Sequence, residues 1–311
     1  MSGERQLDVL TVGDLFVELV MSGFKSWPQP GEEQFAEQFY REVGGGAAIT
    51  ACGLAKLGAK VGIFGSVGEE DGQWMLERLA TLGVATSMIH LNRKEPTAFT
   101  VSVSSPSERA YLTYMGANRE LPRILQKGAP AGELSIARHI HLACAPDPSE
   151  AVILFETLAG KGCSLSVDIG WHPDWLSDAR CREALGHVDI FFPNEREASQ
   201  MTGETSPRQM LEALRRAGLR TVGLKLGAEG AALLCDGQIM FQKPTPVESV
   251  DTTGAGDCFD AGFLNAWLRG SDPEKCLRAG TVCGALSTRA LGGISGFPSK
   301  EELESTICTV K

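Results

Sequence analysis

Residues 250–257 read Val-Asp-Thr-Thr-Gly-Ala-Gly-Asp, the most informative stretch of this 311-residue chain. A β-prone run, Pro246–Val250, leads into it, and the following residues predict an amphipathic helix with Phe259, Phe263 and Trp267 on one face. The glycines are therefore expected at a strand-to-helix turn. Free backbone N–H groups and the positive end of the helix dipole converge at such a turn. The stretch predicts an anion hole suited to phosphate.

Asp257 is expected in the first turn of that helix, where the helix dipole should keep its carboxylate ionised. An ionised carboxylate beside an anion hole can accept the proton of an attacking alcohol while the neighbouring amides stabilise a transferring phosphoryl group. A helix-capping aspartate is the alternative for a generic Gly-x-Gly-Asp. The full string, with both threonines and the flanking aspartate, is far more specific.

The string resembles the C-terminal signature of the ribokinase-like (PfkB) carbohydrate kinases. The resemblance implies an ATP-dependent kinase that phosphorylates a sugar or sugar derivative, with Asp257 as catalytic base. It implies that the amides of Gly254, Ala255 and Gly256 form the anion hole. It also implies a monovalent cation, K⁺, held by one further pair of residues. That pair is Asp251 and the carbonyl group of Thr253.

Short apolar runs alternate with longer helical patterns along most of the chain, and the runs are continuous, as in strands buried on both faces. This alternation predicts right-handed βαβ units and an α/β fold, a mainly parallel sheet covered by helices on both faces, in three layers. The predicted strands are Leu7–Gly13, Lys60–Phe64, Arg138–Leu142, Ser164–Ile169, Val188–Phe192 and Thr221–Leu226. The predicted helices are Ala47–Leu57, Gln73–Leu82, Ser149–Gly160, Pro207–Ala217, Asp257–Leu268 and Pro273–Ala290.

Two stretches interrupt this rhythm. Val17–Val43 is predicted to be extended, with a Pro/Gly hinge at residues 28–31, and Thr97–Ser104 and Arg109–Met115 alternate in the manner of strands. They predict a small projecting sheet that could close over a ligand; a surface hairpin without a role is the alternative. The family resemblance implies a lid over the sugar, through which two chains pair as a homodimer. The predicted division is a core of residues 1–14, 44–95 and 119–311 and a lid of residues 15–43 and 96–118.

The glycines at 44–46 open a predicted helix and resemble the family's N-terminal signature, in which a glycine pair, here Gly45 and Gly46, approaches the substrate. Arg109, on the lid, could reach a substrate oxygen or could stay solvated. The family usually has an aspartate five residues after the glycine that ends the first strand, and here Glu18 stands there. Asp14 is a further candidate for substrate binding.

The family also usually has an asparagine three residues after the glycine turn, where this chain has Ile49. Losing a hydrogen-bonding group leaves a matching substrate hydroxyl unpaired. Ribose and fructose are therefore predicted to be poor substrates. The alternative is that Ile49 only packs under the helix and a neighbouring residue replaces the amide.

Two further motifs resemble the family's nucleotide site. Asn194 and Glu197 match an Asn-x-x-Glu element that organises Mg²⁺ and its waters, and oxygen ligands suit this ion. A helix N-terminus with acidic residues is the alternative. Lys225, Gly227 and Gly230 match a turn that lines the ATP pocket. Contact of Lys225 with a phosphate and simple solvation of this side chain are both open.

The composition of the chain bears on its partners and its location. The net charge of −10 disfavours nucleic acid and anionic lipid as partners. Nine cysteines, without a CxxC pair, and no signal-like or membrane-spanning apolar run indicate reduced thiols in a cytoplasmic protein. His139 and His141 are expected on opposite sides of a strand, without a catalytic role.

Other functions of a glycine-rich α/β chain require other motifs. Neither a dinucleotide fingerprint (G-x-G-x-x-G) nor a Walker phosphate loop (G-x-x-x-x-G-K-[ST]) is complete in the chain. A nucleoside kinase of the same fold and a non-catalytic metabolite-binding relative remain as alternatives to a sugar kinase.

Overall fold

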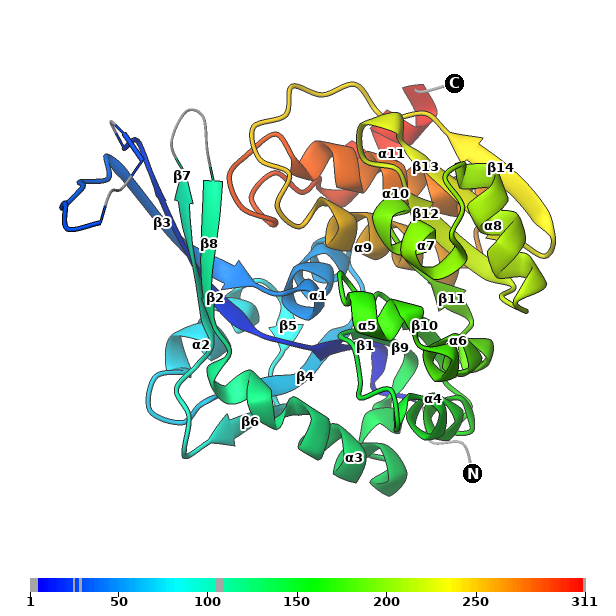
Figure 1. Ribbon diagram of the computed structural model, residues 1–311, viewed down its shortest axis with the longest axis horizontal. Helices are drawn as coiled ribbons and strands as arrows, with labels where there is room; N and C mark the ends of the chain where they lie inside the picture. The colour runs from blue at the N-terminus through cyan, green and yellow to red at the C-terminus, as the bar shows by residue number, and fades with distance from the viewer. Residues whose placement is uncertain (1–4, 25, 28–29, 105–108, 310–311) are drawn as a thin grey trace.

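The computed structural model describes the chain apart from residues 1–4, 25, 28–29, 105–108 and 310–311. Two sheets organise the described residues: a ten-stranded sheet in the main body and a four-stranded sheet that projects from it (Figure 1). Among these residues no helix is both long enough and apolar enough to cross a membrane. All nine cysteines are free, and seven of them are buried.

The large sheet runs in the order β14-β13-β12-β11-β10-β9-β1-β4-β5, with β6 paired to β4. Its strands are β1 (Leu7–Gly13), β4 (Val61–Gly68), β5 (Val84–Ala85), β6 (Ile89–Asn92), β9 (Ala137–Ala143), β10 (Ser164–Val167), β11 (Ile190–Phe191), β12 (Thr221–Lys225), β13 (Ala231–Cys235) and β14 (Gln238–Gln242). The pairings from β12 to β5 are parallel. The predicted mainly parallel sheet is confirmed. Its parallel strands end along one edge, where the βα loops gather.

Each face of the large sheet carries its own hydrophobic core. One core packs α3 (Leu121–Ala131), α4 (Ala151–Ala159), α5 (Pro173–Ser177), α6 (Ala179–Ala184), α7 (Glu195–Thr202) and α8 (Pro207–Arg216). The other packs α1 (Gly46–Lys56), α2 (Gln73–Thr81), α9 (Ala255–Leu268), α10 (Pro273–Ser287) and α11 (Lys300–Thr309). Short 3₁₀ turns are η1 (Gly116–Glu120), η2 (Glu133–Ile136), η3 (Leu185–His187) and η4 (Gly227–Glu229).

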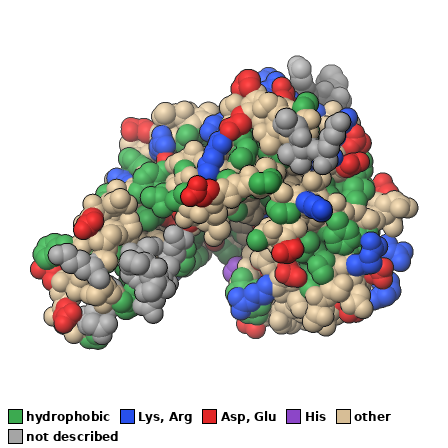
Figure 2. All heavy atoms as spheres, turned by 90° about the horizontal axis from the view of Figure 1, so that it is seen from above, with side chains coloured by type: hydrophobic (Ala, Val, Ile, Leu, Met, Phe, Trp, Pro, Cys, Tyr) green, Lys and Arg blue, Asp and Glu red, His purple; other side chains and the backbone are tan. Residues whose placement is uncertain are grey.

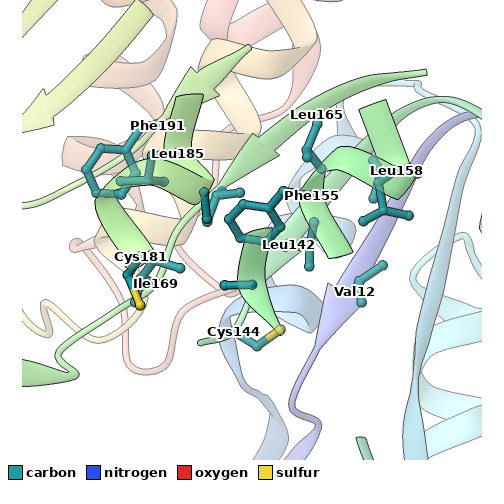
Figure 3. Packing of buried hydrophobic residues seen from close by; sticks show 14 of the residues in the cluster. Val12, Leu142, Cys144, Phe155, Leu158, Leu165, Ile169, Cys181, Leu185 and Phe191 are labelled. Atoms are coloured by element: carbon teal, nitrogen blue, oxygen red, sulfur yellow. The ribbon is translucent and has the colours of Figure 1, made fainter. Parts of the chain in front are cut away.

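The first core shows how α4 packs on one face of the large sheet. Phe155 and Leu158 of α4 face Val12, Leu142 and Leu165 on three neighbouring strands (Figure 3). On their other face β9 and β10 carry the buried polar residues His139, His141 and Ser166, which hydrogen-bond to one another and so avoid the cost of burial without partners. The three-layer arrangement follows from this pattern.

The projecting sheet has the order β3-β2-β7-β8 and is built from β2 (Phe16–Ser22), β3 (Gln38–Gly44), β7 (Phe99–Ser104) and β8 (Arg109–Tyr114). A second, smaller sheet was predicted from the same segments. Its strands alternate in character, because successive side chains point to opposite faces. The aligned residues Leu19, Val101 and Leu112 make one face mostly apolar, although Arg41 of β3 pairs with Leu19, whereas Glu18 and Thr100 belong to the other face.

Three local predictions fail or fall outside the described residues. The run Pro246–Val250 is not a strand: residues 243–249 have no regular structure, and the N–H groups of Val250 and Asp251 donate to the Thr288 carbonyl at 2.7 and 2.9 Å. The glycine motif therefore follows a loop, which α10 holds in place. Pro28 and Gln29 of the predicted hinge, and the turn at 105–108, lie outside the described part of the chain.

The prediction for the two strand histidines is also wrong. His139 and His141 share one face of β9, since residues two apart in a strand point the same way. Ser166 Oγ lies 2.7 Å from Nε2 of His139 and 2.8 Å from Nδ1 of His141. Burial lowers the pKa of His139 to about 3 and that of His141 to about 4, so both rings are neutral at physiological pH.

Candidate active site

The N-terminus of α9 is formed by the glycine motif. Gly254 precedes the helix with φ of 70°, in the left-handed region, and a Cβ there would lie 2.8 Å from Cδ1 of Ile49. Only glycine accepts both conditions without strain. No described side chain caps α9, which begins at Ala255, two residues earlier than predicted. The Ala255 N–H donates to the Thr252 carbonyl at 3.2 Å, whereas the N–H group of Gly256 lies at the positive end of the helix dipole, beside the adjoining cavity that Gly256 lines.

That cavity has a volume of about 690 Å³, and the part lined by the neighbouring residues Asp168, Asp257 and Lys225 is its polar end. Figure 2 shows the molecule hollowed between the projecting sheet and the main body. The glycine motif and Lys225 line this cavity, as do the apolar residues Pro246 and Val247. Gly227 and Gly230 also line it, and a Cβ on Gly230 would clash with the Gln242 carbonyl oxygen. The cavity thus combines an anion site with room for an apolar ring.

Asp257 lies at the polar end, but in a different state from the one predicted. Burial, and then the nearby Asp168, raise the pKa of Asp257 to about 7. Desolvation and a like charge outweigh the helix dipole that was expected to keep this carboxylate ionised. The pKa of Asp257 therefore lies near neutral pH, which is the range that suits a general base.

Two acidic residues that the sequence interpretation missed surround this position. Asp168 follows β10, and Asp260 lies three residues beyond Asp257 on α9; carboxylate oxygens of the three lie within 4.8 Å of one another. Nζ of Lys225 lies 2.6 Å from Oδ2 of Asp168 and 3.5 Å from Oδ1 of Asp260. The i, i+3 spacing of the two helical aspartates was a usable signal, because such residues share a helix face.

Lys225 and the carboxylates of Asp168 and Asp260 lie close enough to shift one another's pKa values. Burial by itself would lower the pKa of Lys225, but Asp168 and Asp260 raise it above its usual value. Burial raises the pKa of Asp260 far above its ordinary range, whereas Lys225 overcomes burial and lowers the pKa of Asp168. With its side chain only 12% exposed, Lys225 is not simply solvated, which removes one of the two alternatives left open.

Asn194 and Glu197 form a reciprocal cap at the start of α7. The Glu197 N–H donates to Oδ1 of Asn194 at 2.9 Å, and the Asn194 N–H donates to Oε2 of Glu197 at 2.9 Å. Both residues line the cavity, and burial followed by Asp168 raises the pKa of Glu197. The pair is thus a helix cap, as one alternative held, and also lies at the polar end of the cavity.

Asp251 connects the glycine motif to the closing segment of the chain. Its Oδ1 accepts hydrogen bonds from the backbone N–H and the hydroxyl group of Thr253, at 3.1 and 2.8 Å. Its Oδ2 accepts the Gly292 N–H at 2.9 Å. The buried carboxylate therefore fixes the loop that carries the anion site.

Each glycine of the triplet at 44–46 lies close to another part of the chain. A Cβ on the first glycine would lie 2.8 Å from Oε2 of Glu18, and one on the second would clash with the Asp14 carbonyl oxygen. A Cβ on Gly46 would lie 2.7 Å from Oδ1 of Asp257, which is distant in the sequence. Close backbone approach therefore explains each glycine.

The structure gives the surroundings of Ile49 but not those of the Arg109 side chain. Ile49 is buried against the glycine turn, where Gly254 and Gly293 contact it. Arg109 begins β8, but its side chain lies outside the described part of the structure.

Comparison with known proteins places this geometry in context. The family described as pfkB family carbohydrate kinase matches residues 6–300. The chain is 28% identical to 2-dehydro-3-deoxygluconokinase of Bacillus subtilis, over 86% of this chain and 87% of that protein. It is 30% identical to ribokinase of Haemophilus influenzae, over 88% and 90% of the two chains. It is 29% identical to a nucleoside kinase of Methanothermobacter thermautotrophicus, over 97% and 95%.

Solved structures agree with the fold. Arabidopsis thaliana ribokinase, complexed with ribose and ATP, superposes with a TM-score of 0.82 at 25% identity, over 97% of this chain and 98% of that one. A ribokinase II from E. coli, in complex with ATP and Mg²⁺, superposes with a TM-score of 0.79 at 23% identity, over 97% and 99%.

Proposed function

The chain belongs to the pfkB family of carbohydrate kinases, and we propose that it transfers the terminal phosphoryl group of ATP to an alcohol group of a sugar or sugar derivative. The observation that carries this proposal is the position of Asp257. Its carboxylate lies against Gly46 on one side and belongs to the first turn of α9 on the other. A base in this position can serve an acceptor and an anion site at once.

In the proposed reaction, Asp257 removes the proton from the acceptor hydroxyl as its oxygen attacks the terminal phosphorus of ATP. The bond from that phosphorus to the bridging oxygen breaks, and ADP leaves. The Gly254–Gly256 amides and Lys225 stabilise the negative charge on the transferring group. Lys225 is held near this turn, since its Nζ would lie 3.4 Å from a Cβ on Gly256.

The ligand assignments extend this proposal. Residues that bind ATP are Asn194, Lys225, Gly227, Gly230 and the glycines of the α9 turn. Residues that bind the acceptor are Asp14, Glu18, Gly45, Gly46, Arg109 and Asp257. Of these, the close contacts of the 44–46 triplet support the acceptor set, and the 690 Å³ cavity supports the ATP set.

Magnesium fits the polar end of the cavity. Asn194 and Glu197 supply oxygen atoms there, and both of their side chains already bond to each other. A contact through water, which Mg²⁺ commonly keeps, leaves this cap intact. When bound, the ion neutralises charge on the ATP phosphates. We extend the proposal to a monovalent cation, K⁺, held by Asp251 and the Thr253 carbonyl.

The experiment that tests the proposal is an ADP-release screen with MgATP and pentoses, ketohexoses, 2-keto-3-deoxy sugar acids and nucleosides as acceptors. At least one acceptor is expected to raise ADP release above the rate with water alone, with ribose and fructose poor. Intact ATP binding without stimulation by any acceptor would favour a non-catalytic metabolite-binding protein. Repeating the assay in potassium and in a bulky organic cation tests the K⁺ assignment separately.

A further inference from the structure

Asp260 is a buried acid to which the proposed reaction gives no role. It lies on α9, three residues beyond Asp257, and its side chain is fully buried. The neighbouring residues Cys258, Ala261 and Phe263 belong to the hydrophobic core under the sheet. An ionisable side chain is costly in such surroundings unless a partner compensates it. Packing of the helix therefore gives no reason for an acid at this position.

The partner of Asp260 is the ammonium group of Lys225. Nζ of Lys225 lies 3.5 Å from Oδ1 of Asp260, and among the described side chains no other charged cation lies within 4.0 Å of this carboxylate. His141 approaches as well, with Nε2 at 4.0 Å from Oδ2, but burial keeps its ring neutral. Lys225 is therefore the group through which Asp260 can influence the reaction.

Asp260 is separated from the ligands of the proposed reaction. Lys225 and Asp168 both line the 690 Å³ cavity assigned to ATP, whereas Asp260 is absent from its wall. A carboxylate that is fully buried and outside this wall offers no surface to ATP or to the acceptor. Its effect on catalysis must pass through a residue that does line the cavity.

Three elements meet at the Lys225 ammonium group. Lys225 ends β12, Asp168 follows β10 at 2.6 Å from Nζ, and Asp260 belongs to α9. Asp168 is itself held in place, because its Oδ1 accepts the Gly170 N–H at 3.1 Å. A lysine side chain is long and flexible, so one carboxylate would leave Nζ free to move around it. Two carboxylates from different elements restrict Nζ to the side of the cavity next to Gly256.

We propose that Asp260 is a positioning residue, which together with Asp168 holds the Lys225 ammonium group against the phosphoryl group in transfer. A positive group that is already in place when negative charge develops stabilises the transition state without first having to reorganise. This inference rests on the proposed kinase function and adds to it a role for a residue that contacts neither ATP nor the acceptor.

The first test removes the charge of Asp260 and keeps its size, using MgATP and the acceptor with the highest kcat/KM in the ADP-release screen. In Asp260→Asn, kcat is expected to fall roughly 10- to 100-fold, the effect of a misplacement of up to about 1 Å. The KM for ATP should stay near wild type, because the charge of Lys225 remains in the cavity. Asn265→Leu, a buried change on the same helix outside the cavity, is the matched control and should keep the wild-type kcat.

The outcomes of this test separate the inference from the kinase function. A wild-type kcat in Asp260→Asn would overturn the positioning role while leaving the kinase function intact. A wild-type enzyme that releases no ADP with any acceptor would instead refute the kinase function.

The second test asks whether Asp260 acts through Lys225. Lys225→Met removes the ammonium group, so adding Asp260→Asn to this variant should lower kcat no further. The same fold loss of kcat from Asp260→Asn in both backgrounds would contradict the inference, because it would show an effect independent of Lys225.

A binding measurement needs no variant of Lys225. ADP with Mg²⁺ and aluminium fluoride mimics the phosphoryl group in transfer, and its affinity is measured by titration calorimetry in the presence of the same acceptor. Asp260→Asn should weaken this mimic by about the factor lost in kcat and leave the affinity for ATP close to wild type. An equal loss of affinity for the mimic and for ATP would contradict a role confined to the transferring group.

Discussion

At the scale of single residues, Asp257 carries the strongest prediction. Asp257→Asn keeps the size of the side chain but cannot accept the proton of the acceptor alcohol. We expect kcat to fall roughly 10²–10⁴-fold, the usual contribution of a positioned base. ATP affinity, measured by titration calorimetry, should remain close to wild type. Turnover near the wild-type rate would show that another group removes the proton.

The acidic limb of the pH–rate profile tests the same residue in another way. Burial and Asp168 raise the pKa of Asp257 to about 7, and only the ionised form acts as a base. The kcat/KM of the wild-type enzyme should therefore rise with pH and level off above about 7. A profile that is flat from pH 5 to pH 8 would contradict this assignment.

The contribution of Asp257 to stability should fall with rising pH, whereas its contribution to kcat/KM should rise. The pKa of Asp257 is about 7 in the folded chain, against an ordinary value of 3.8, so the folded state binds more protons between these values. The contribution of Asp257 to the free energy of unfolding therefore falls as pH rises from about 4 to about 7. Relative to wild type, Asp257→Asn should raise Tm at pH 8 more than at pH 4. An equal difference in Tm at both pH values would contradict the raised pKa.

At the scale of an element, the start of α1 depends on the absence of a side chain. In Gly46→Ala the new Cβ would lie 2.7 Å from Oδ1 of Asp257, so the base must shift. We expect kcat/KM to fall by about 100-fold, the effect of a misplacement of about 1 Å. Gly186→Ala is the matched control, since a Cβ there meets nothing within 4 Å. Wild-type kinetics in Gly46→Ala would mean that this contact does not position the base.

Other elements explain where local prediction succeeds and where it fails. Ala231–Cys235 and Gln238–Gln242 form an antiparallel hairpin that was not predicted, although Asp236-Gly237 between them is a strong hairpin signal. Both turn residues have positive φ, 45° and 81°. Conversely, the run Pro246–Val250 has strand-like residues but no strand partner, and a strand forms only where its backbone is paired.

At the scale of the whole molecule, the exposed apolar face of the projecting sheet leads us to predict a dimer. Its apolar face exposes Phe39 and Leu112, each 65% exposed, and we propose that this face pairs with a second copy while the polar face covers the acceptor. Sedimentation should show a species of twice 33.2 kDa. Phe39→Glu/Leu112→Glu should sediment as a monomer.

A matched control separates this interface from general loss of apolar surface. Phe241 of β14 is also exposed, at 50%, but lies on the edge strand of the large sheet. Phe241→Glu should remain a dimer. A wild-type protein that sediments only as a single chain at micromolar concentration would contradict the pairing.

Much of the fold follows from the order of residues along the chain. Continuous apolar runs such as Leu7–Gly13 predict buried parallel strands, and helical periodicity places the covering helices to within a few residues. The glycine string likewise predicts the start of α9 and its anion site. These features are local, because backbone hydrogen bonding and side-chain periodicity act over a few residues.

The chemistry of the site depends on contacts between distant parts of the chain. The approach of Gly46 to Asp257, and the cluster of Asp168, Asp260 and Lys225, arise at the sheet edge where β10 and β12 end and α1 and α9 begin. Burial and charge separation in that cluster set the pKa of Asp257, and both are products of packing rather than of residue order. The sequence therefore determines the elements and the reactive motif, whereas tertiary packing determines the charge state of the base and the shape of the adjoining cavity.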